Sequence, residues 1–201
     1  MLTLYGTSKS RSARSLWALE ELGLKYEHVP VEVAKAKSPE HLQRNPNGHV
    51  PVLNDDGHYL WESMAINLYL AEKYGKTPLW PATADGHGDC YKWSFFAITE
   101  CEQHLLTILT HRLFLPADQR DEKVIQKATD SLKAPFKVLD DQLKNRPYLL
   151  GNDFTIADLN AAAVLSFAML VKLDLSATPA AQAWLQKCLG REANQRVRAL
   201  P

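Results

Sequence analysis

Hydrophobic and polar positions in the first 75 residues alternate between the period of a strand and the period of a helix. Strand patterns are predicted at 2–5, 26–31, 50–55 and 56–61, the last two joined by an Asp-Asp-Gly hairpin signal. Helical patterns are predicted at 10–23, 38–45 and 63–75. The resulting order, β-α-β-α-β-β-α, predicts an α/β domain in which helices pack on a mixed sheet.

The pattern changes after Gly75. Residues 76–88 contain two prolines and two glycines and follow neither period, which is typical of a linker. Beyond it only helical patterns occur, near 89–113, 120–145, 155–172 and 178–190, with a short one near the end. We therefore expect an α/β domain at 1–76, a linker at 77–87 and an all-helical domain at 88–201.

The stretch GNDFTIADL, which begins at Gly151, carries the clearest helix start of the second half. Thr155 as N-cap and Asp158 three residues later predict a capping box, and Phe154 and Leu159 occupy the positions of a hydrophobic staple. Because this spacing already accounts for Asp158, we interpret it as structural rather than as a catalytic carboxylate.

Composition and charge narrow the function classes. The 201 residues carry 23 basic and 23 acidic side chains, so bulk charge predicts no attraction to nucleic acid or to an anionic membrane. No apolar segment reaches the roughly 20 residues that cross a bilayer, and the N-terminus shows no secretory signal. Cys90, Cys101 and Cys188 are widely spaced without a CxxC pair, which favours a reducing, cytoplasmic location. Seven scattered histidines without an HExxH pattern favour no metal site.

Two short stretches carry the candidate chemistry. Pro51 lies in the strand pattern GHVPVL, where a proline removes a ladder donor and is tolerated mainly at a strand's first residue. Glu62 and Ser63 stand where a strand pattern runs directly into a helical one. A serine that caps a helix leaves free N–H groups at a positive dipole end, and this predicts an anion site at Ser63.

Four motifs occur in one order along both predicted domains: YGTSKSRSARSLWALEELGL, NPNGHVPVL, LWESMAINLYLAEKYG and LLGNDFTIADL. On these motifs the chain resembles a cytosolic glutathione transferase over essentially its whole length, and it looks most like the serine-type bacterial and fungal members. The resemblance implies a thioredoxin-like N-terminal domain, a helical C-terminal domain and a homodimer. It also implies glutathione as co-substrate, with a small electrophile as the second substrate.

The resemblance assigns roles along the N-terminal domain. It implies a cis peptide bond before Pro51, which would present the backbone of Val50 to the cysteinyl part of glutathione. It places the γ-glutamyl carboxylate on Ser63 and the γ-glutamyl amine near Glu62. Lys37 and His49 stand where relatives place cationic groups for the glycine carboxylate.

The thiolate of glutathione needs a hydrogen-bond donor, because a free thiol with a pKa of about 8.5 is mostly protonated at neutral pH. Ser10 with Arg14 fits the S-x-x-x-R spacing of serine-using relatives. Tyr5, Ser8, Ser12 and a backbone N–H remain alternatives. In this interpretation Ser10 donates a hydrogen bond, and the nucleophile is glutathione itself.

The acceptor pocket of this family is faced by the first long helix of the second domain, where Phe96, Glu100 and His104 recur at helical spacing. Such a stripe is also typical of a core. We expect an enzyme that conjugates glutathione to small hydrophobic electrophiles. The alternatives are a glutathione-dependent peroxidase or disulfide reductase, and a non-catalytic binding module.

Overall fold

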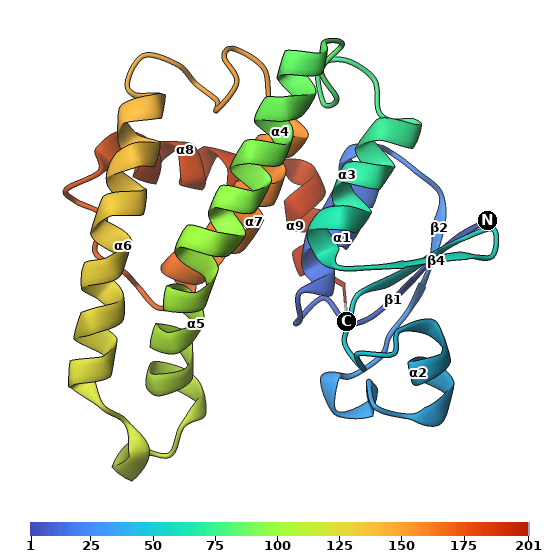
Figure 1. Ribbon diagram of the computed structural model, residues 1–201, viewed down its shortest axis with the longest axis horizontal. Coiled ribbons are helices and arrows are strands. Elements are labelled where there is room, and N and C mark those ends of the chain that lie inside the picture. Colours follow the sequence, from blue (N-terminus) through green and yellow to red (C-terminus); the bar gives the residue numbers. More distant parts are fainter. Residues whose placement is uncertain (201) are drawn as a thin grey trace. The chain divides into compact units, whose positions relative to one another are not determined.

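The computed structural model describes residues 1–200; Pro201 lies outside the described residues. The chain divides into two compact units (Figure 1). The first comprises Met1–Trp80 together with the segment that begins at Gly190, and the second comprises Pro81–Leu189.

The first unit is built on a four-stranded mixed sheet in the order β2-β1-β3-β4. Its strands are β1 (Leu2–Tyr5), β2 (Tyr26–Val29), β3 (Val52–Asp55) and β4 (His58–Trp61). β2 runs parallel to β1, whereas β3 runs antiparallel to both β1 and β4. The helices α1 (Ser12–Glu21), α2 (Pro39–Arg44) and α3 (Ser63–Tyr74) alternate with these strands, and a short 3-10 turn occupies Val33–Lys35. The predicted element order and the thioredoxin-like fold are confirmed.

The core of the first unit lies where α1 and α3 pack together on the sheet, and Figure 1 shows these helices side by side. Leu16 and Leu19 of α1 and Ile66 and Leu70 of α3 are fully buried. Their spacing of three or four residues puts them on one face of each helix. Leu4, at the centre of β1, is also fully buried.

A buried carboxylate fastens β3 to the end of α3. One oxygen of Asp55 accepts hydrogen bonds from Tyr69 (2.7 Å), Lys73 (2.6 Å) and Tyr74 (2.7 Å). Burial alone would raise the pKa of Asp55, but the three donors outweigh it and lower that pKa to about 2. The charged carboxylate therefore stabilises the native unit.

The second unit is all-helical. It contains α4 (Ala84–Phe96), α5 (Gln103–Leu109), α6 (Glu122–Leu143), α7 (Ile156–Leu170) and α8 (Pro179–Leu189). The single helix predicted near 89–113 is instead interrupted by π-helical turns at Ala97–Glu102 and Thr110–Phe114, and a 3-10 turn follows at Ala117–Gln119. α7 packs against α4, α5 and α8 and is buried on most sides, as expected for a helix that is apolar nearly all round.

The start of α7 is organised around Asp158. Thr155 is the N-cap, and the reciprocal bonds of a capping box are present. One oxygen of Asp158 accepts from the Thr155 N–H (3.0 Å) and hydroxyl (2.9 Å). The other accepts from the Leu149 N–H (2.8 Å) and from Trp184 Nε1 (2.9 Å). Asp158 thus joins the loop before α7, α7 itself and α8.

The structure differs from the expected domain boundaries at both ends of the second domain. The expected linker 77–87 contains the start of α4, where the Thr83 hydroxyl caps the helix by accepting from the Gly86 N–H (3.1 Å). The last helix, α9 (Glu192–Arg198), which was expected within 88–201, instead packs on α1 in the first unit. The start of α4 was not predicted because two glycines weaken its helical pattern. The place of α9 depends on contacts with residues far away in the sequence.

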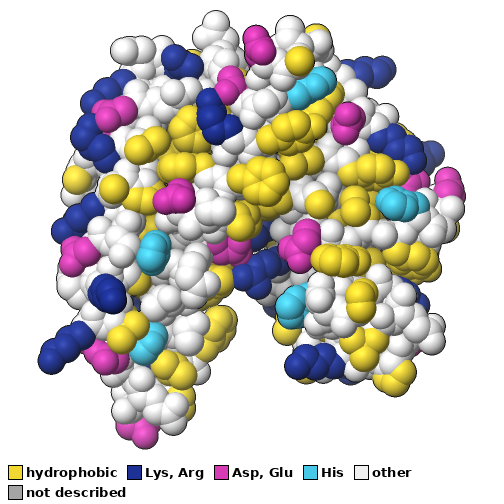
Figure 2. All heavy atoms as spheres, in the orientation of Figure 1, with side chains coloured by type: hydrophobic (Ala, Val, Ile, Leu, Met, Phe, Trp, Pro, Cys, Tyr) yellow, Lys and Arg dark blue, Asp and Glu magenta, His cyan; other side chains and the backbone are white. Residues whose placement is uncertain are grey.

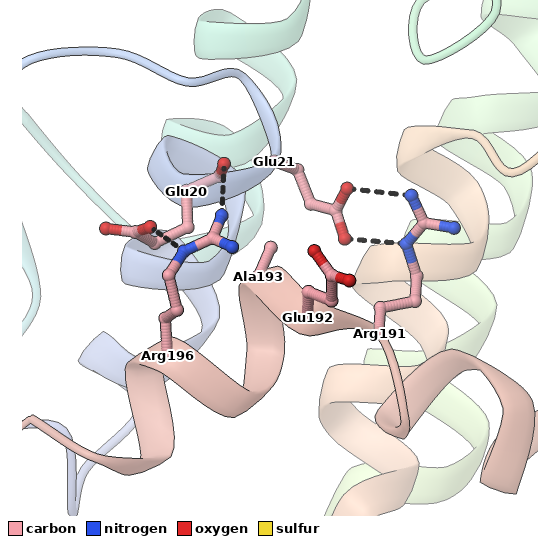
Figure 3. Close-up of a pocket in the computed structure, with 6 residues that line it drawn as sticks. All are labelled: Glu20, Glu21, Arg191, Glu192, Ala193 and Arg196. Atoms are coloured by element: carbon pink, nitrogen blue, oxygen red, sulfur yellow. Dashed lines mark hydrogen bonds and ion pairs between the residues drawn. The ribbon is translucent and has the colours of Figure 1, made fainter.

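Ion pairs hold α9 on the C-terminal end of α1 (Figure 3). Glu21 binds Arg191 in a bidentate pair at 2.6 and 2.9 Å, and Glu20 binds Arg196 at 2.7 Å. These groups line a hollow of about 340 Å³ together with Glu192 and Ala193. Because four of its five charged side chains pair with one another, we interpret the hollow as part of this junction.

Charged side chains of both signs occur on the face drawn in Figure 2. Within each unit, Figure 2 shows acidic side chains lying among the basic ones, with neither sign gathered into a patch on the face drawn. Among residues 1–200, no helix has both the length and the apolar character that crossing a membrane requires.

Candidate functional site

The sheet register brings most of the predicted site residues to one end of the strands, termed here the site edge of the sheet. Tyr5 pairs with Val29 and with Val52, and Val52 pairs with Trp61. This row contains the last residues of β1, β2 and β4 and the first residue of β3. At the site edge the chain therefore leaves β1, β2 and β4 and enters β3. The segments next to these strand ends contain Ser10, Lys37, His49–Pro51 and Glu62–Ser63.

Gly6 allows the start of α1 and the segment before β3 to approach each other closely. Its φ is +139°, and a Cβ added there would lie 1.9 Å from Ser12 Oγ and 3.2 Å from the Val50 Cβ. Only glycine allows this backbone conformation and this close approach. The start of α1 and Val50 are thus neighbours, although about 40 residues separate them in sequence.

Ser10 lies in the turn before α1 and is half-buried. Its hydroxyl lies 2.8 Å from the Thr7 carbonyl and 3.0 Å from Ser12 Oγ, and its oxygen accepts the Ser12 N–H at 3.1 Å. The next two helix N–H groups, of Ala13 and Arg14, are bonded to the carbonyls of Ser10 and Arg11. The N–H groups of Ser12, Ala13 and Arg14 therefore already have acceptors, and the Ser10 hydroxyl is a candidate donor to a ligand at this turn.

The alternative hydroxyls have other partners. Ser8 donates to the Leu200 carbonyl at 2.9 Å, and Ser12 is fully buried against Ser10. The ring of Tyr5 is covered by the guanidinium of Arg44 of α2, whose central carbon lies 4.3 Å from the ring centroid. Of these four side chains, Ser10 is the partly exposed hydroxyl that lies nearest the start of α1.

The peptide bond between Val50 and Pro51 is cis. Val50 lies outside the β3 ladder, and neither its N–H nor its C=O makes a hydrogen bond within residues 1–200. Unpaired N–H and C=O groups on one residue next to a strand end can pair with an extended peptide as a neighbouring strand would.

The strand-to-helix junction differs by one residue from the expectation. Glu62, rather than Ser63, is the N-cap of α3, and it is exposed with φ +72° and ψ 112°. Ser63 is the first residue of the helix and is 6% exposed. A non-glycine residue with a positive φ costs on the order of 1–3 kcal/mol and is typical of functional sites. The N–H groups of Ser63, Met64 and Ala65 have no acceptor within residues 1–200, and a helix start with free N–H groups can bind an anion.

Lys37 and His49 are both exposed, on neighbouring segments. A Cβ added to Gly48 would lie 3.1 Å from Lys37 Cγ, so the stem of Lys37 packs against the turn that precedes His49. The structure thus places Lys37 beside the turn that leads to His49 and Val50.

The expected acceptor residues belong to the second unit. Phe96 is the last residue of α4 and forms an edge-to-face pair with the buried Trp93, at a centroid distance of 5.3 Å. Glu100 is exposed in the following π turn, and His104 is half-buried in α5. Trp93 belongs to the helical core.

The cysteines of the second unit are poorly suited to nucleophilic chemistry. Within residues 1–200 the three cysteines are buried and none forms a disulfide, and burial raises the pKa of Cys90 and of Cys101 to about 12. Such thiols are protonated at neutral pH and are poor nucleophiles. Within residues 1–200, no group of three or more His, Cys, Asp or Glu side chains is arranged to hold a metal ion.

Sequence reasoning missed two residues of this edge. His41 and Asn45, from α2 and its C-terminus, are buried and both donate to the His49 carbonyl, each at 2.9 Å. The Asn-Pro-Asn-Gly run signals a turn, but the direction of these side chains depends on how α2 packs.

The first unit is thioredoxin-like, with a cis-proline before its third strand and, at the same edge, a helix whose first N–H groups are unpaired. Joined to an all-helical unit, it has the architecture of the glutathione transferases. The profile of the glutathione S-transferase N-terminal domain matches residues 1–72, and that of the C-terminal domain matches residues 99–192. The chain belongs to the glutathione S-transferase family.

Individual relatives cover the whole chain. Glutathione S-transferase GstB of Escherichia coli is 32% identical over 100% of this chain and 99% of its own. Glutathione S-transferase 1 of Zea mays is 35% identical over 99% and 96%. The structure of glutathione S-transferase-I with lactoylglutathione superposes with a TM-score of 0.87 at 34% identity, over 98% of both chains. A Phanerochaete chrysosporium transferase in complex with oxidized glutathione gives 0.87 at 27% identity, over 98% and 94%.

Proposed function

We propose that the protein is a glutathione transferase that adds the thiolate of glutathione to small hydrophobic electrophiles. The observation that carries this proposal is that three kinds of group share the site edge of the sheet. They are a hydroxyl at a helix start, the unpaired N–H and C=O of Val50, and a helix N-terminus with unpaired N–H groups. Glutathione is an extended peptide with a central thiol and charged ends, and this edge supplies one group for each part. The glutathione compounds bound to structural relatives support the same ligand.

Ser10 is the proposed thiolate donor. Its oxygen accepts the Ser12 N–H, which polarises the O–H, and its proton can turn from the Thr7 carbonyl to a ligand sulfur. Lowering the pKa of a thiol by two units requires about 2.7 kcal/mol. A charge-assisted hydrogen bond at the positive end of α1 has this magnitude.

The remaining groups are proposed to hold the peptide. The N–H and C=O of Val50, just before Pro51, pair with the cysteinyl backbone. Ser63 and the start of α3 bind the γ-glutamyl carboxylate, and Glu62 accepts from the γ-glutamyl amine. Lys37 binds the glycine carboxylate by charge, and His49 binds it by a hydrogen bond from its ring.

The electrophile side of the proposal rests on the family resemblance. Phe96, Glu100 and His104 are the proposed acceptor residues, with haloarenes, epoxides, enones and organic peroxides as substrate classes. A cytoplasmic homodimer without a metal cofactor is proposed on the same ground, and three buried cysteines without a disulfide suit a reducing compartment. Light scattering of the purified protein tests the dimer.

Retention on immobilised glutathione, followed by turnover assays with a chlorodinitrobenzene-type substrate, cumene hydroperoxide and a mixed disulfide, tests the function. We expect retention and conjugation. Turnover of the peroxide or the disulfide alone would replace conjugation by one of those activities. Retention without any turnover would indicate a binding module, and no retention at all would overturn the proposed site.

A further inference from the structure

Two buried side chains hold the carbonyl of His49. His41 Nε2 and Asn45 Nδ2 each lie 2.9 Å from this oxygen. His41 is 1% exposed and Asn45 is 2% exposed, so neither can touch a ligand at the surface. Because a carbonyl can only accept, both nitrogens donate, and Nε2 of His41 carries the proton.

The orientation of the Asn45 amide is fixed from its other end. Its Oδ1 accepts the Asn47 N–H at 3.0 Å, so its Nδ2 must face His49. The turn is closed further by the Gly48 N–H, which donates to the Asn45 carbonyl at 2.9 Å. Gly48 has φ +63°, and a Cβ there would meet the Ala36 carbonyl at 3.1 Å. The segment before Val50 is therefore held by side chains and by close packing.

This arrangement sets the direction of the Val50 N–H. The peptide unit between His49 and Val50 is trans, and in a planar trans unit the C=O and the N–H point in opposite directions. Because the two donors fix the His49 carbonyl toward α2, the Val50 N–H must point away from α2. That N–H is one of the two groups with which the edge would bind a peptide.

We propose that His41 and Asn45, termed here the α2 clamp, are positioning residues that pre-orient the Val50 N–H for the backbone of glutathione. The inference rests on the proposed function for its ligand, but the clamp itself is a property of the unliganded protein. A pre-oriented donor costs less ordering when the ligand binds, so the clamp raises affinity without contacting the ligand. It leaves the Ser10 hydrogen bonds untouched, so it should not alter the acidity of the bound thiol.

Isosteric variants test the clamp through glutathione binding. Asn45→Asp can still accept the Asn47 N–H but has no donor for His49. His41→Leu removes the second donor, and His41→Gln restores an N–H. We expect Asn45→Asp and His41→Leu each to raise the dissociation constant for glutathione about five- to tenfold, the equivalent of one hydrogen bond. His41→Gln should return to within about twofold of the wild type.

A purely structural role of His41 and Asn45 would not confine the effect of the variants to the affinity for glutathione. The control is Gln43→Ala, an exposed position on the same helix. In the clamp variants the kcat at saturating glutathione and the pKa of the bound thiol should stay at wild-type values, with KM for glutathione alone rising. Unchanged glutathione affinity in folded His41→Leu, or equal losses in Gln43→Ala, would overturn the proposal.

A measurement without ligand separates the clamp from the proposed function. The ¹⁵N relaxation of the Val50 amide in the unliganded protein should give an order parameter near 0.85, typical of rigid backbone, and a clear fall in Asn45→Asp. If wild-type protein bound no glutathione, the proposed function would fail while this result could still support the clamp. An equally rigid Val50 amide in both proteins would overturn the clamp, whatever the ligand.

Discussion

Replacing Asp158 by asparagine removes one of the two acceptor oxygens that organise the start of α7. In the native protein each carboxylate oxygen accepts two hydrogen bonds, from donors in the preceding loop, at the N-cap and on α8. An asparagine side chain has one acceptor oxygen and one amide group, so two of the four donors lose their acceptor. If the amide faces Thr155, the Thr155 hydroxyl can turn and accept from it, and the Thr155 N–H is left unsatisfied.

The expected loss follows from these contacts. An unsatisfied buried donor costs about 1–3 kcal/mol, and the lost charge-assisted bonds add to this cost. The substitution also removes a buried charge: burial raises the pKa of Asp158 above its ordinary value even against four hydrogen bonds. Relief of that charge offsets part of the loss. We expect the free energy of unfolding to fall by about 2–3 kcal/mol.

Urea unfolding followed by circular dichroism and tryptophan fluorescence measures this change. Because the chain has two units, the transition of the second unit is the relevant one. Asp153→Asn, at an exposed position of the same loop, is the matched control and should change stability by less than about 0.5 kcal/mol. Trp184→Phe removes only one donor and should cost less than Asp158→Asn. Equal stabilities of Asp158→Asn and Asp153→Asn would refute the reasoning.

Three further predictions concern the first unit. The native pKa of Asp55, about 2, lies below its ordinary 3.8, so this carboxylate contributes about 2 kcal/mol that is present above about pH 4 and lost as pH falls through 2. Asp55→Asn should remove this part of the acid dependence in urea titrations, and an identical acid profile would contradict it. Gly6→Ala, whose Cβ would lie 1.9 Å from Ser12 Oγ, should weaken glutathione binding at least about tenfold by calorimetry, and wild-type affinity would exclude the close approach. Lys37→Ala should raise KM for glutathione about fivefold at low salt and less at high salt, whereas Lys35→Ala should not; equal effects would remove Lys37 from the site.

The fold could be predicted wherever local patterns decide it. The strands and the helices α1 to α3 follow from alternating and helical periods, and the capping box before α7 follows from the spacing of Thr155 and Asp158. The position of α9 could not be predicted, because it depends on ion pairs such as Glu21–Arg191, which join residues 170 positions apart. The start of α4 was missed because Gly86 and Gly88 weaken a helical pattern that Thr83 nevertheless caps.

The candidate site was predictable where a residue type implies its chemistry. Pro51 indicated an unusual strand entry, and the Glu62–Ser63 junction indicated an open helix start. That Glu62 rather than Ser63 is the N-cap depends on a positive φ, which sequence rarely predicts for glutamate. His41 carried no signal, since a buried histidine on a short helix resembles any core residue until the direction of its ring is known.

The central claim is that the Ser10 hydroxyl stabilises the thiolate of bound glutathione, and the most direct test is the pKa of that thiol. Ultraviolet thiolate absorbance of the enzyme–glutathione complex, titrated with pH, gives this value for the wild type and for Ser10→Ala, with Ser8→Ala and Tyr5→Phe as controls. The account predicts a wild-type pKa about two units below the 8.5 of a free thiol, a return toward 8.5 in Ser10→Ala, and no change in the controls. A thiol pKa that is the same in Ser10→Ala and in the wild type would contradict it.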